Sequence, residues 1–319
     1  MRFLKNLIPL KIKLLLVKIL PFLKKNQVQD LFNTKLWLNL YEGKIEKYKL
    51  NKESRNPKVC IVSLSYKNLD YTKLCLKSIF ASTTYDNFEV IVVDNASEDG
   101  TAEWLLEYQK THPNLKLILN KENLGFSGGN NQAVRETDSD YVIFLNNDTV
   151  VTEGWIEGML EVFLTDPKIG LVGPVTNAIG NEACILVDYT HPKNFESYVK
   201  NRKNKLNRVF EIRMVAFFCA MTKRDVYLSL GGLDERYSVG MFEDDDMCVT
   251  YQKAGYKIYC TEKVFIHHFH GASFKKLNPD YYSDIFEENR KKYESKWKKT
   301  WTAYEMRPEV QAFIQKQNP

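Results

Sequence analysis

Short apolar runs alternate with amphipathic segments from Lys58 onwards, and this alternation is the main pattern of the sequence. Four runs rich in β-branched residues are typical of buried strands: 59–66, 88–93, 115–119 and 141–145. Residues 71–82 place apolar side chains at helical spacing, and Asp70 precedes them as a candidate N-cap. A further helix is expected to begin near Gly129.

Alternating strands and helices predict an α/β fold with a mostly parallel central sheet flanked by helices on both faces. Ligands bind such sheets beyond the carboxyl ends of the strands. Three of the predicted strands end in conspicuous polar groups: Ser65-Tyr66, Asp94-Asn95 and Asn146-Asn147-Asp148. We therefore expect a polar ligand site along this edge of the sheet.

The loop after the second strand reads VDNASEDGT. The carboxylate of Asp94 can accept hydrogen bonds from a nucleotide base or ribose, and the following helix N-terminus favours phosphate. Ser97, Asp99 and Thr101 are candidate caps for that helix. An ordinary capped turn explains the same residue types, so this loop by itself leaves both readings open.

The stretch NLGFSGGNNQAV is a glycine-rich loop that opens a helix, and Gly125, Gly128 and Gly129 allow close approach of the backbone to a ligand. It has neither the lysine of a P-loop nor the spacing GxGxxG, which disfavours a P-loop NTPase and a dinucleotide-dependent oxidoreductase. In FLNNDT, the single carboxylate of Asp148 suits a divalent cation that also binds a diphosphate.

Two motifs in the second half carry further chemistry. The stretch MFEDDDMCVTYQKAGY places four acids, Glu243 to Asp246, at the start of a helix that ends near Gly255. Clustered carboxylates raise one another's pKa, which suits a general base, although capping alone also favours acids there. In FIHHFHG, a strand would place His268 and His270 on one face and His267 on the other.

Taken together, VSLSY, FEVIVVDNASEDGT, ENLGFSGGNNQAV and FLNNDT, in this order, resemble family 2 glycosyltransferases of the GT-A fold. The similarity runs from about Lys58 to about Trp297 and is strongest to the branch that contains bacterial rhamnosyltransferases. It implies a GT-A domain over 58–300, with a nucleotide-sugar-binding half at 58–150 and an acceptor half at 151–300 that includes a small C-terminal lobe. Residues 1–57 would form a helical extension and connector, and 301–319 a tail.

The resemblance also implies roles for individual residues. Asp244 would be the catalytic base with Glu243 supporting it, and Asp148 and His268 would hold Mg²⁺ or Mn²⁺. His270 is the alternative to His268. Tyr66-Lys67-Asn68 departs from the aromatic-Asn pattern of the family, and Asn146-Asn147-Asp148 has one carboxylate where the strict DxD motif has two. The implied donor-binding residues are Ser65, Tyr66, Asp94, Asn95, Ser97, Asn123, Gly125, Gly128, Asn147 and Asp148.

The implied activity is inverting transfer of a sugar from a nucleoside-diphosphate sugar, with dTDP-rhamnose as the first expectation. The acceptor would be a hydroxyl of a saccharide or lipid-linked saccharide in cell-surface polysaccharide synthesis. Two alternatives remain: a nucleotidyltransferase, which also needs a metal-binding aspartate, and a non-catalytic subunit that binds sugar nucleotides. FEENRKKYESKW, at 286–297, resembles a tail motif of the family, and MVAFFCAMTKRDVYLSLGGLDERY resembles its acceptor wall.

The first 25 residues mix Leu, Ile and Phe with six lysines and one arginine, without an uninterrupted apolar run near 20 residues. Such a segment favours an anionic membrane surface, although packing on protein explains it as well. The net charge of +5 is too modest to call for a nucleic-acid partner. Six scattered cysteines indicate a reducing compartment, so we expect a cytoplasmic enzyme at the inner face of the cell membrane.

Overall fold

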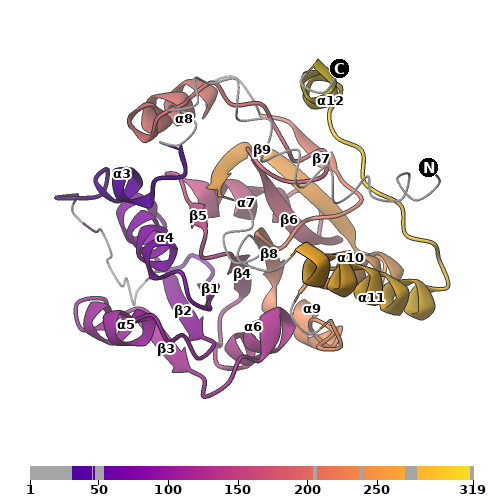
Figure 1. Cartoon of the computed structure of the whole chain (residues 1–319), viewed down its shortest axis with the longest axis horizontal. Coiled ribbons are helices and arrows are strands. Elements are labelled where there is room, and N and C mark those ends of the chain that lie inside the picture. Colours follow the sequence, from indigo (N-terminus) through magenta and orange to yellow (C-terminus); the bar gives the residue numbers. More distant parts are fainter. Residues whose placement is uncertain are drawn as a thin grey trace.

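A computed structural model of the chain describes residues 31–44, 46, 54–203, 207–237, 240–269 and 279–316. Within them, nine strands form one curled sheet in the order β3-β2-β1-β4-β8-β6-β9-β5, and β7 pairs with β9 (Figure 1). The strands are β1 Val59–Ser65, β2 Phe88–Asp94, β3 Leu115–Leu119, β4 Tyr141–Leu145, β5 Thr149–Val150, β6 Ile169–Thr176, β7 Val209–Glu211, β8 Cys219–Lys223 and β9 Lys257–His268.

The first four strands are parallel to one another, as the sequence predicts. The rest of the sheet is mixed, because β8 runs antiparallel to both β4 and β6. β9 is parallel to β6 and antiparallel to β5 and β7. The expectation of a mostly parallel sheet therefore fits the half before residue 150 and needs correction for the other half. The reason is that a buried antiparallel strand has the same apolar composition as a buried parallel strand.

Helices surround the sheet, with α6 packed on β1 and β2, and α7 packed on β6 and β9 (Figure 1). The helices are α3 Thr34–Leu38, α4 Leu69–Ser82, α5 Thr101–Gln109, α6 Gly125–Arg135, α7 Trp155–Phe163, α8 Phe195–Lys203, α9 Arg224–Ser229, α10 Glu243–Lys253, α11 Pro279–Trp297 and α12 Pro308–Lys316, with a short 3₁₀ helix at Pro192–Asn194.

Two helix starts differ from the prediction. The N-cap of α4 is Asn68 rather than Asp70, and the backbone N–H of Leu69 donates to Asp99 Oδ2 at 3.0 Å. Asp99 therefore serves the start of α4, and α5 has Gly100 as an N-cap without a side-chain cap bond. α6 begins at Gly125 rather than near Gly129, because the Asn123 side chain accepts from the Gly125 N–H at 2.9 Å.

The end of the N-terminal extension packs on the core. Trp37 of α3 is fully buried, and its indole N–H donates to the Leu31 carbonyl at 2.9 Å. The predicted membrane segment at 1–25 lies outside the described residues. No helix among the residues that the structure describes is both long and apolar enough to cross a membrane. All six cysteines are buried and free.

Candidate functional site

The carboxyl ends of β1 and β2 bring Ser65 and Asp94 side by side in register. Asp94 is buried, and its Oδ2 accepts from the Ser97 N–H at 3.0 Å. Its Oδ1 is also buried and has no hydrogen-bond partner among the described residues. Because an unsatisfied buried carboxylate oxygen is costly, this atom is a candidate acceptor for a donor group on a ligand.

Asn95 holds the glycine-rich loop in place. Its amide donates to the Gly125 carbonyl at 3.1 Å, and its Oδ1 accepts from Asn120 at 3.0 Å. Asn120 and Gln132 in turn exchange two side-chain hydrogen bonds. The Asn95 side chain is thus occupied by contacts within the protein. Asn120 and Gln132 could not be predicted from the sequence, since their pairing depends on contact between a strand end and a helix.

Gly129 is required for close packing. A Cβ atom at this position would lie 2.8 Å from Leu64 Cδ2 on β1 and 3.3 Å from the Asn95 amide nitrogen. At Gly128, a Cβ atom would lie 3.1 Å from the Cβ of Leu124 in the preceding turn. Gly129 lets α6 approach the sheet, and this approach places the N-terminus of the helix beside Asn95.

Thr72 of α4 joins two predicted donor-site residues. Its hydroxyl lies 2.8 Å from Ser65 Oγ and accepts from the Asn147 amide at 3.0 Å. All three side chains are buried. The ends of β1 and β4 are therefore tied through one helix residue, which no local sequence signal could have identified.

The turn after β1 is strained. Lys67 and Asn68 both have positive φ angles, 57° and 70°, and the Lys67 N–H donates to Ser97 Oγ at 2.8 Å. Ser97 therefore supports this turn. Tyr66 is 40% exposed, and its ring faces the Lys67 ammonium, with 5.3 Å between the nitrogen and the ring centroid. Left-handed non-glycine residues cost about 1 to 3 kcal/mol each and concentrate at functional sites.

Asp148 and His268 lie together although the sequence separates them widely. β5 pairs with β9 so that Thr149 lies opposite His268, and the Phe269 N–H donates to the Asp148 carbonyl at 2.9 Å. Asp148 Oδ1 is 3.3 Å from His268 Nε2, and both side chains are buried. The sheet thus brings the two predicted metal ligands into contact.

The orientation of the His268 ring fits metal binding. Its Nδ1 lies 3.1 Å from the Ala178 carbonyl, which can only accept, so Nδ1 carries a proton and Nε2 faces Asp148. Nε2 and a carboxylate oxygen are stable neighbours when a cation or a proton lies between them. Adjacent ligands of an octahedral ion, each about 2.1 Å from it, lie roughly 3 Å apart, close to the 3.3 Å found here.

Further contacts fix His268 in this position. Asn177, just after β6, accepts from the His268 N–H at 2.8 Å and donates to the His268 carbonyl at 3.0 Å. Phe218 stacks on the imidazole with 4.9 Å between ring centroids. The described residues contain no group of three or more His, Cys, Asp or Glu side chains that could hold a metal, so within this part of the chain a diphosphate or water would have to complete the coordination.

His267 points to the opposite face of β9, as predicted for a strand. Its Nδ1 lies 2.5 Å from the Tyr189 hydroxyl, and its ring packs on Trp37 with 4.5 Å between centroids. Burial lowers the pKa of His267 to about 3, so the ring is neutral. His270 lies outside the described residues.

The carboxylates at the acid-rich start of α10 differ in their burial and in their hydrogen-bond partners. Asp245 Oδ1 accepts from the Trp301 indole N–H at 2.8 Å and from the Tyr304 hydroxyl. Burial, and then the charge of Asp245, raise the pKa of Tyr304, which therefore stays a proton donor. Glu243 is buried, whereas Asp244 is only half-buried and accepts from the Asp245 N–H at 2.9 Å.

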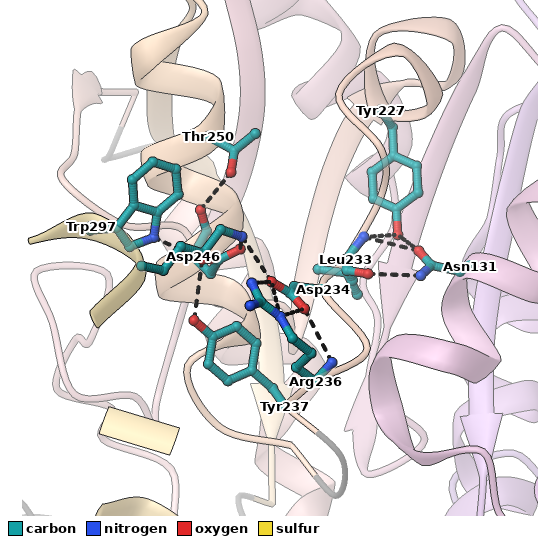
Figure 2. A network of polar contacts seen from close by, with 10 residues as sticks. Asn131, Tyr227, Leu233, Asp234, Arg236, Tyr237, Asp246, Thr250 and Trp297 are labelled. Atoms are coloured by element: carbon teal, nitrogen blue, oxygen red, sulfur yellow. Dashed lines mark hydrogen bonds and ion pairs between the residues drawn. The ribbon is translucent and has the colours of Figure 1, made fainter. Parts of the chain in front are cut away.

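The last acid of the group, Asp246, connects α10 to neighbouring elements (Figure 2). Its carboxylate accepts from Tyr237 at 3.2 Å, from Trp297 at 2.7 Å and from Lys296 at 2.7 Å. Together with Asp245, it is held by side-chain donors from the chain beyond residue 295. Sequence reasoning placed 301–319 in a separate tail and missed the contacts of Trp301 and Tyr304.

In Figure 2, Leu233 and Asp234 of the loop at 231–237 lie between Asn131 of α6 and Asp246 of α10. On one side, Asn131 Oδ1 accepts from the Leu233 N–H at 2.9 Å and from the Tyr227 hydroxyl at 2.5 Å. On the other side, the Tyr237 hydroxyl donates to Asp246 of α10 at 3.2 Å, and the Lys296 ammonium donates to both Asp234 and Asp246. The loop is thereby anchored to the glycine-rich helix and to the acidic helix.

This loop requires a glycine at position 232. Gly232 has a φ angle of 73°, and a Cβ atom there would lie 2.5 Å from Asn131 Oδ1. The second glycine of the Gly-Gly pair therefore has a steric cause that links it to the helix of the glycine-rich loop.

These features agree with a comparison of the sequence to known families. The profile described as "Glycosyl transferase family 2" matches residues 60–231, more than half of the chain. The chain belongs to glycosyl transferase family 2. The matched region contains Asp94, the glycine-rich loop and Asp148, whereas α10 and His268 lie beyond it.

Among similar curated proteins, "Uncharacterized protein y4gI" of Sinorhizobium fredii is 26% identical over 68% of this chain and 25% of its own length. The "O-antigen biosynthesis protein RfbC" of Myxococcus xanthus is 27% identical over 68% of this chain and 18% of its own length. The chain thus spans a quarter or less of the length of these two relatives.

Solved structures confirm the predicted GT-A fold. The "Mannosyltransferase PcManGT from Pyrobaculum calidifontis in complex with GDP-Man and Mn2+" superposes with a TM-score of 0.57. The alignment covers 95% of this chain and 79% of that protein at 17% identity. At this identity the similarity concerns the fold alone.

Proposed function

We propose that this family 2 member is an inverting, metal-assisted glycosyltransferase that uses a nucleoside-diphosphate sugar. The observation that carries the proposal is the contact of Asp148 with His268 at 3.3 Å, at the strand edge that also bears the open carboxylate of Asp94. A metal-binding pair beside an acceptor for a nucleotide is what a diphosphate-sugar donor requires. A nucleotidyltransferase could use the same strand edge, but it would not need the acidic start of α10.

The donor site is proposed to run along the ends of β1, β2 and β4. Asp94 accepts a hydrogen bond from the base or ribose through Oδ1, and the exposed ring of Tyr66 covers the nucleotide. Gly125 and Gly128 line the pocket with backbone, positioned by Asn123 and Asn95. Ser65, Ser97 and Asn147 are positioning residues in this scheme, because their side chains bind Thr72 or the turn after β1.

Asp244 is proposed as the general base and Glu243 as its support. Asp244 takes the proton of the acceptor hydroxyl as the oxygen attacks the anomeric carbon. The bond from that carbon to the diphosphate oxygen breaks on the opposite side, which inverts the configuration. Asp245 and Asp246 accept hydrogen bonds from Trp301, Tyr304, Trp297 and Lys296. The choice of Asp244 rests on the family resemblance of the acidic motif.

Asp148 and His268 would hold Mg²⁺ or Mn²⁺, which when bound stabilises the negative charge of the departing diphosphate. Both side chains are positioned from the backbone, Asp148 through β5 and His268 through Asn177. This arrangement fixes the ligands before a donor arrives.

We propose dTDP-rhamnose as the donor and a saccharide or lipid-linked saccharide in cell-surface polysaccharide synthesis as the acceptor. Support comes from the rhamnosyltransferase-like motifs and from the O-antigen biosynthesis relative. Calorimetric titration with dTDP-, UDP- and GDP-sugars, with Mg²⁺ and with Mn²⁺, tests the donor. NMR of the product then tests the reaction: a retained anomeric configuration contradicts inversion, and a transferred nucleotide contradicts sugar transfer.

Asp94→Asn is expected to weaken donor binding by about 10- to 100-fold, because a hydrogen bond to a buried charged group is lost. The turnover number should change much less, since Asp94 lies at the end of β2 and the proposed base, Asp244, lies on α10. Calorimetry with the donor measures the effect. Asp138→Asn, at an exposed ion pair with Lys58, is the matched control and should bind donor normally.

We also propose that residues 1–25 bind anionic membrane surfaces. Each basic residue contributes about 1 kcal/mol near such a surface, and salt weakens this part of the attraction. Deletion of 1–25 should therefore abolish co-sedimentation with anionic vesicles and spare transfer to water-soluble acceptors. Equal sedimentation of the intact and truncated proteins would show that the segment packs on protein instead.

A further inference from the structure

The backbone before α10 has an unusual conformation. Gly240, Met241 and Phe242 have consecutive positive φ angles of 133°, 77° and 73°. Bulky L-residues disfavour this region, so neighbouring groups must hold the turn. The Phe242 carbonyl accepts from the Asp246 N–H at 2.8 Å at the start of the helix. The turn therefore sets the direction of the first helical turn, which carries Asp244.

Asn289 of α11 binds this turn directly. Its amide nitrogen donates to the Gly240 carbonyl at 2.9 Å and to the Met241 carbonyl at 3.2 Å, and the side chain is 1% exposed. The Lys292 ammonium donates to Asn289 Oδ1 at 3.2 Å, which fixes which end of the amide faces the turn. An amide with two donors can satisfy two adjacent carbonyls, whereas a carboxylate of the same shape cannot.

Aromatic contacts hold the same turn from its other end. The Phe242 ring packs on Phe286 and Tyr293 of α11, with centroid distances of 5.1 and 5.7 Å, and on Trp301 at 5.4 Å. Phe286, Asn289 and Tyr293 share one face of α11 at helical spacing. One face of α11 thus binds the carbonyls of Gly240 and Met241 and packs on the side chain of Phe242.

We propose that Asn289 is a positioning residue for catalysis that acts by aiming Asp244. The inference rests on the proposed function, because it takes Asp244 as the base. Asn289 binds the carbonyls of Gly240 and Met241 and so stabilises the left-handed turn. This turn fixes the direction of the first turn of α10, which determines the position of the Asp244 carboxylate. The family-like motif at 286–297 gains a physical role in this way.

Asn289→Ala should lower kcat by up to about 10²-fold, as expected for a small displacement of a reacting group, with donor KM unchanged. Asn289→Asp should cost at least as much, since its carboxylate repels both carbonyls. Lys292→Met, which changes a partly exposed residue, should fold normally and show a smaller loss of kcat. Asn114→Ala is the matched control: Asn114 is buried, and its amide donates to the Phe88 carbonyl at the far end of β2, so kcat should not change.

A double-mutant cycle with Asp244→Asn separates positioning from general stability. If Asn289 acts through Asp244, Asn289→Ala costs nothing further in the Asp244→Asn background. Unchanged kcat in both Asn289→Ala and Lys292→Met, or a full additive loss in the cycle, overturns the inference and leaves the proposed function intact. Full activity of Asp244→Asn alone instead overturns the proposed base and the inference with it.

Discussion

Asp244→Asn is expected to reduce sugar transfer by about 10²- to 10⁴-fold, because it removes proton acceptance and keeps the shape of the side chain. Donor binding should stay near that of the wild type, since Asp244 lies on α10 and not at the strand ends that form the proposed donor site. Initial rates with labelled donor measure the first quantity, and calorimetry measures the second.

A suitable control for this substitution is Asp225→Asn, which changes a highly exposed acid in the first turn of α9. It should leave both rate and affinity unchanged. If Asp244→Asn kept more than a few per cent of wild-type turnover, the base would have to be Glu243 or Asp245. Asp245 could act as the base only after losing its hydrogen bonds from Trp301 and Tyr304. In that case the substitutions Trp301→Phe and Tyr304→Phe would alter the pH profile of the transfer rate.

Removal of the metal should stop turnover, and Asp148→Ala should raise the metal concentration required or end activity. The physical reason is that one of two protein ligands is lost from a site in which a diphosphate supplies others. His268→Ala should have a milder effect of the same kind, because a neutral ligand is lost rather than a charged one. Titration of Mn²⁺ by electron paramagnetic resonance, with nucleoside diphosphate present, measures binding separately from activity.

His267→Phe serves as the control for the metal prediction. The substitution keeps a ring within the cluster around Trp37, so stability should fall moderately while the metal requirement stays that of the wild type. Full activity in exhaustively demetallated enzyme would refute the role given to Asp148 and His268. In that case the short distance between them would have to reflect an imidazolium–carboxylate ion pair.

The sequence predicts the strands of the first half well, because buried parallel strands are continuous β-branched runs and the polar residues that end them stand out. Asp94 ends β2 as expected, and Asp148 lies in the turn between β4 and β5. The antiparallel direction of β8 could not be predicted, since its apolar residues give no sign of direction. The helix starts at Leu69 and Gly125 were misplaced because their caps depend on neighbouring loops.

The contact between Asp148 and His268 followed from the family resemblance, because nothing local connects the residue before β5 with the last residue of β9. The supporting residues were missed for a related reason. Thr72 reads as an ordinary helical threonine, and Asn177 as a turn residue after β6. Their roles come from hydrogen bonds across the fold, which no window of sequence contains.

The contacts of Trp301 and Tyr304 with Asp245 have a consequence for biosynthesis. A chain made from its N-terminus completes the parallel strands and the glycine-rich loop well before these two residues are added. The stretch from Glu243 to Tyr304 takes on the order of several seconds to synthesise. During that interval the nascent chain has the edge proposed to bind the nucleotide but lacks the donors that hold Asp245, so the acidic helix reaches its final arrangement only after Tyr304 has been added.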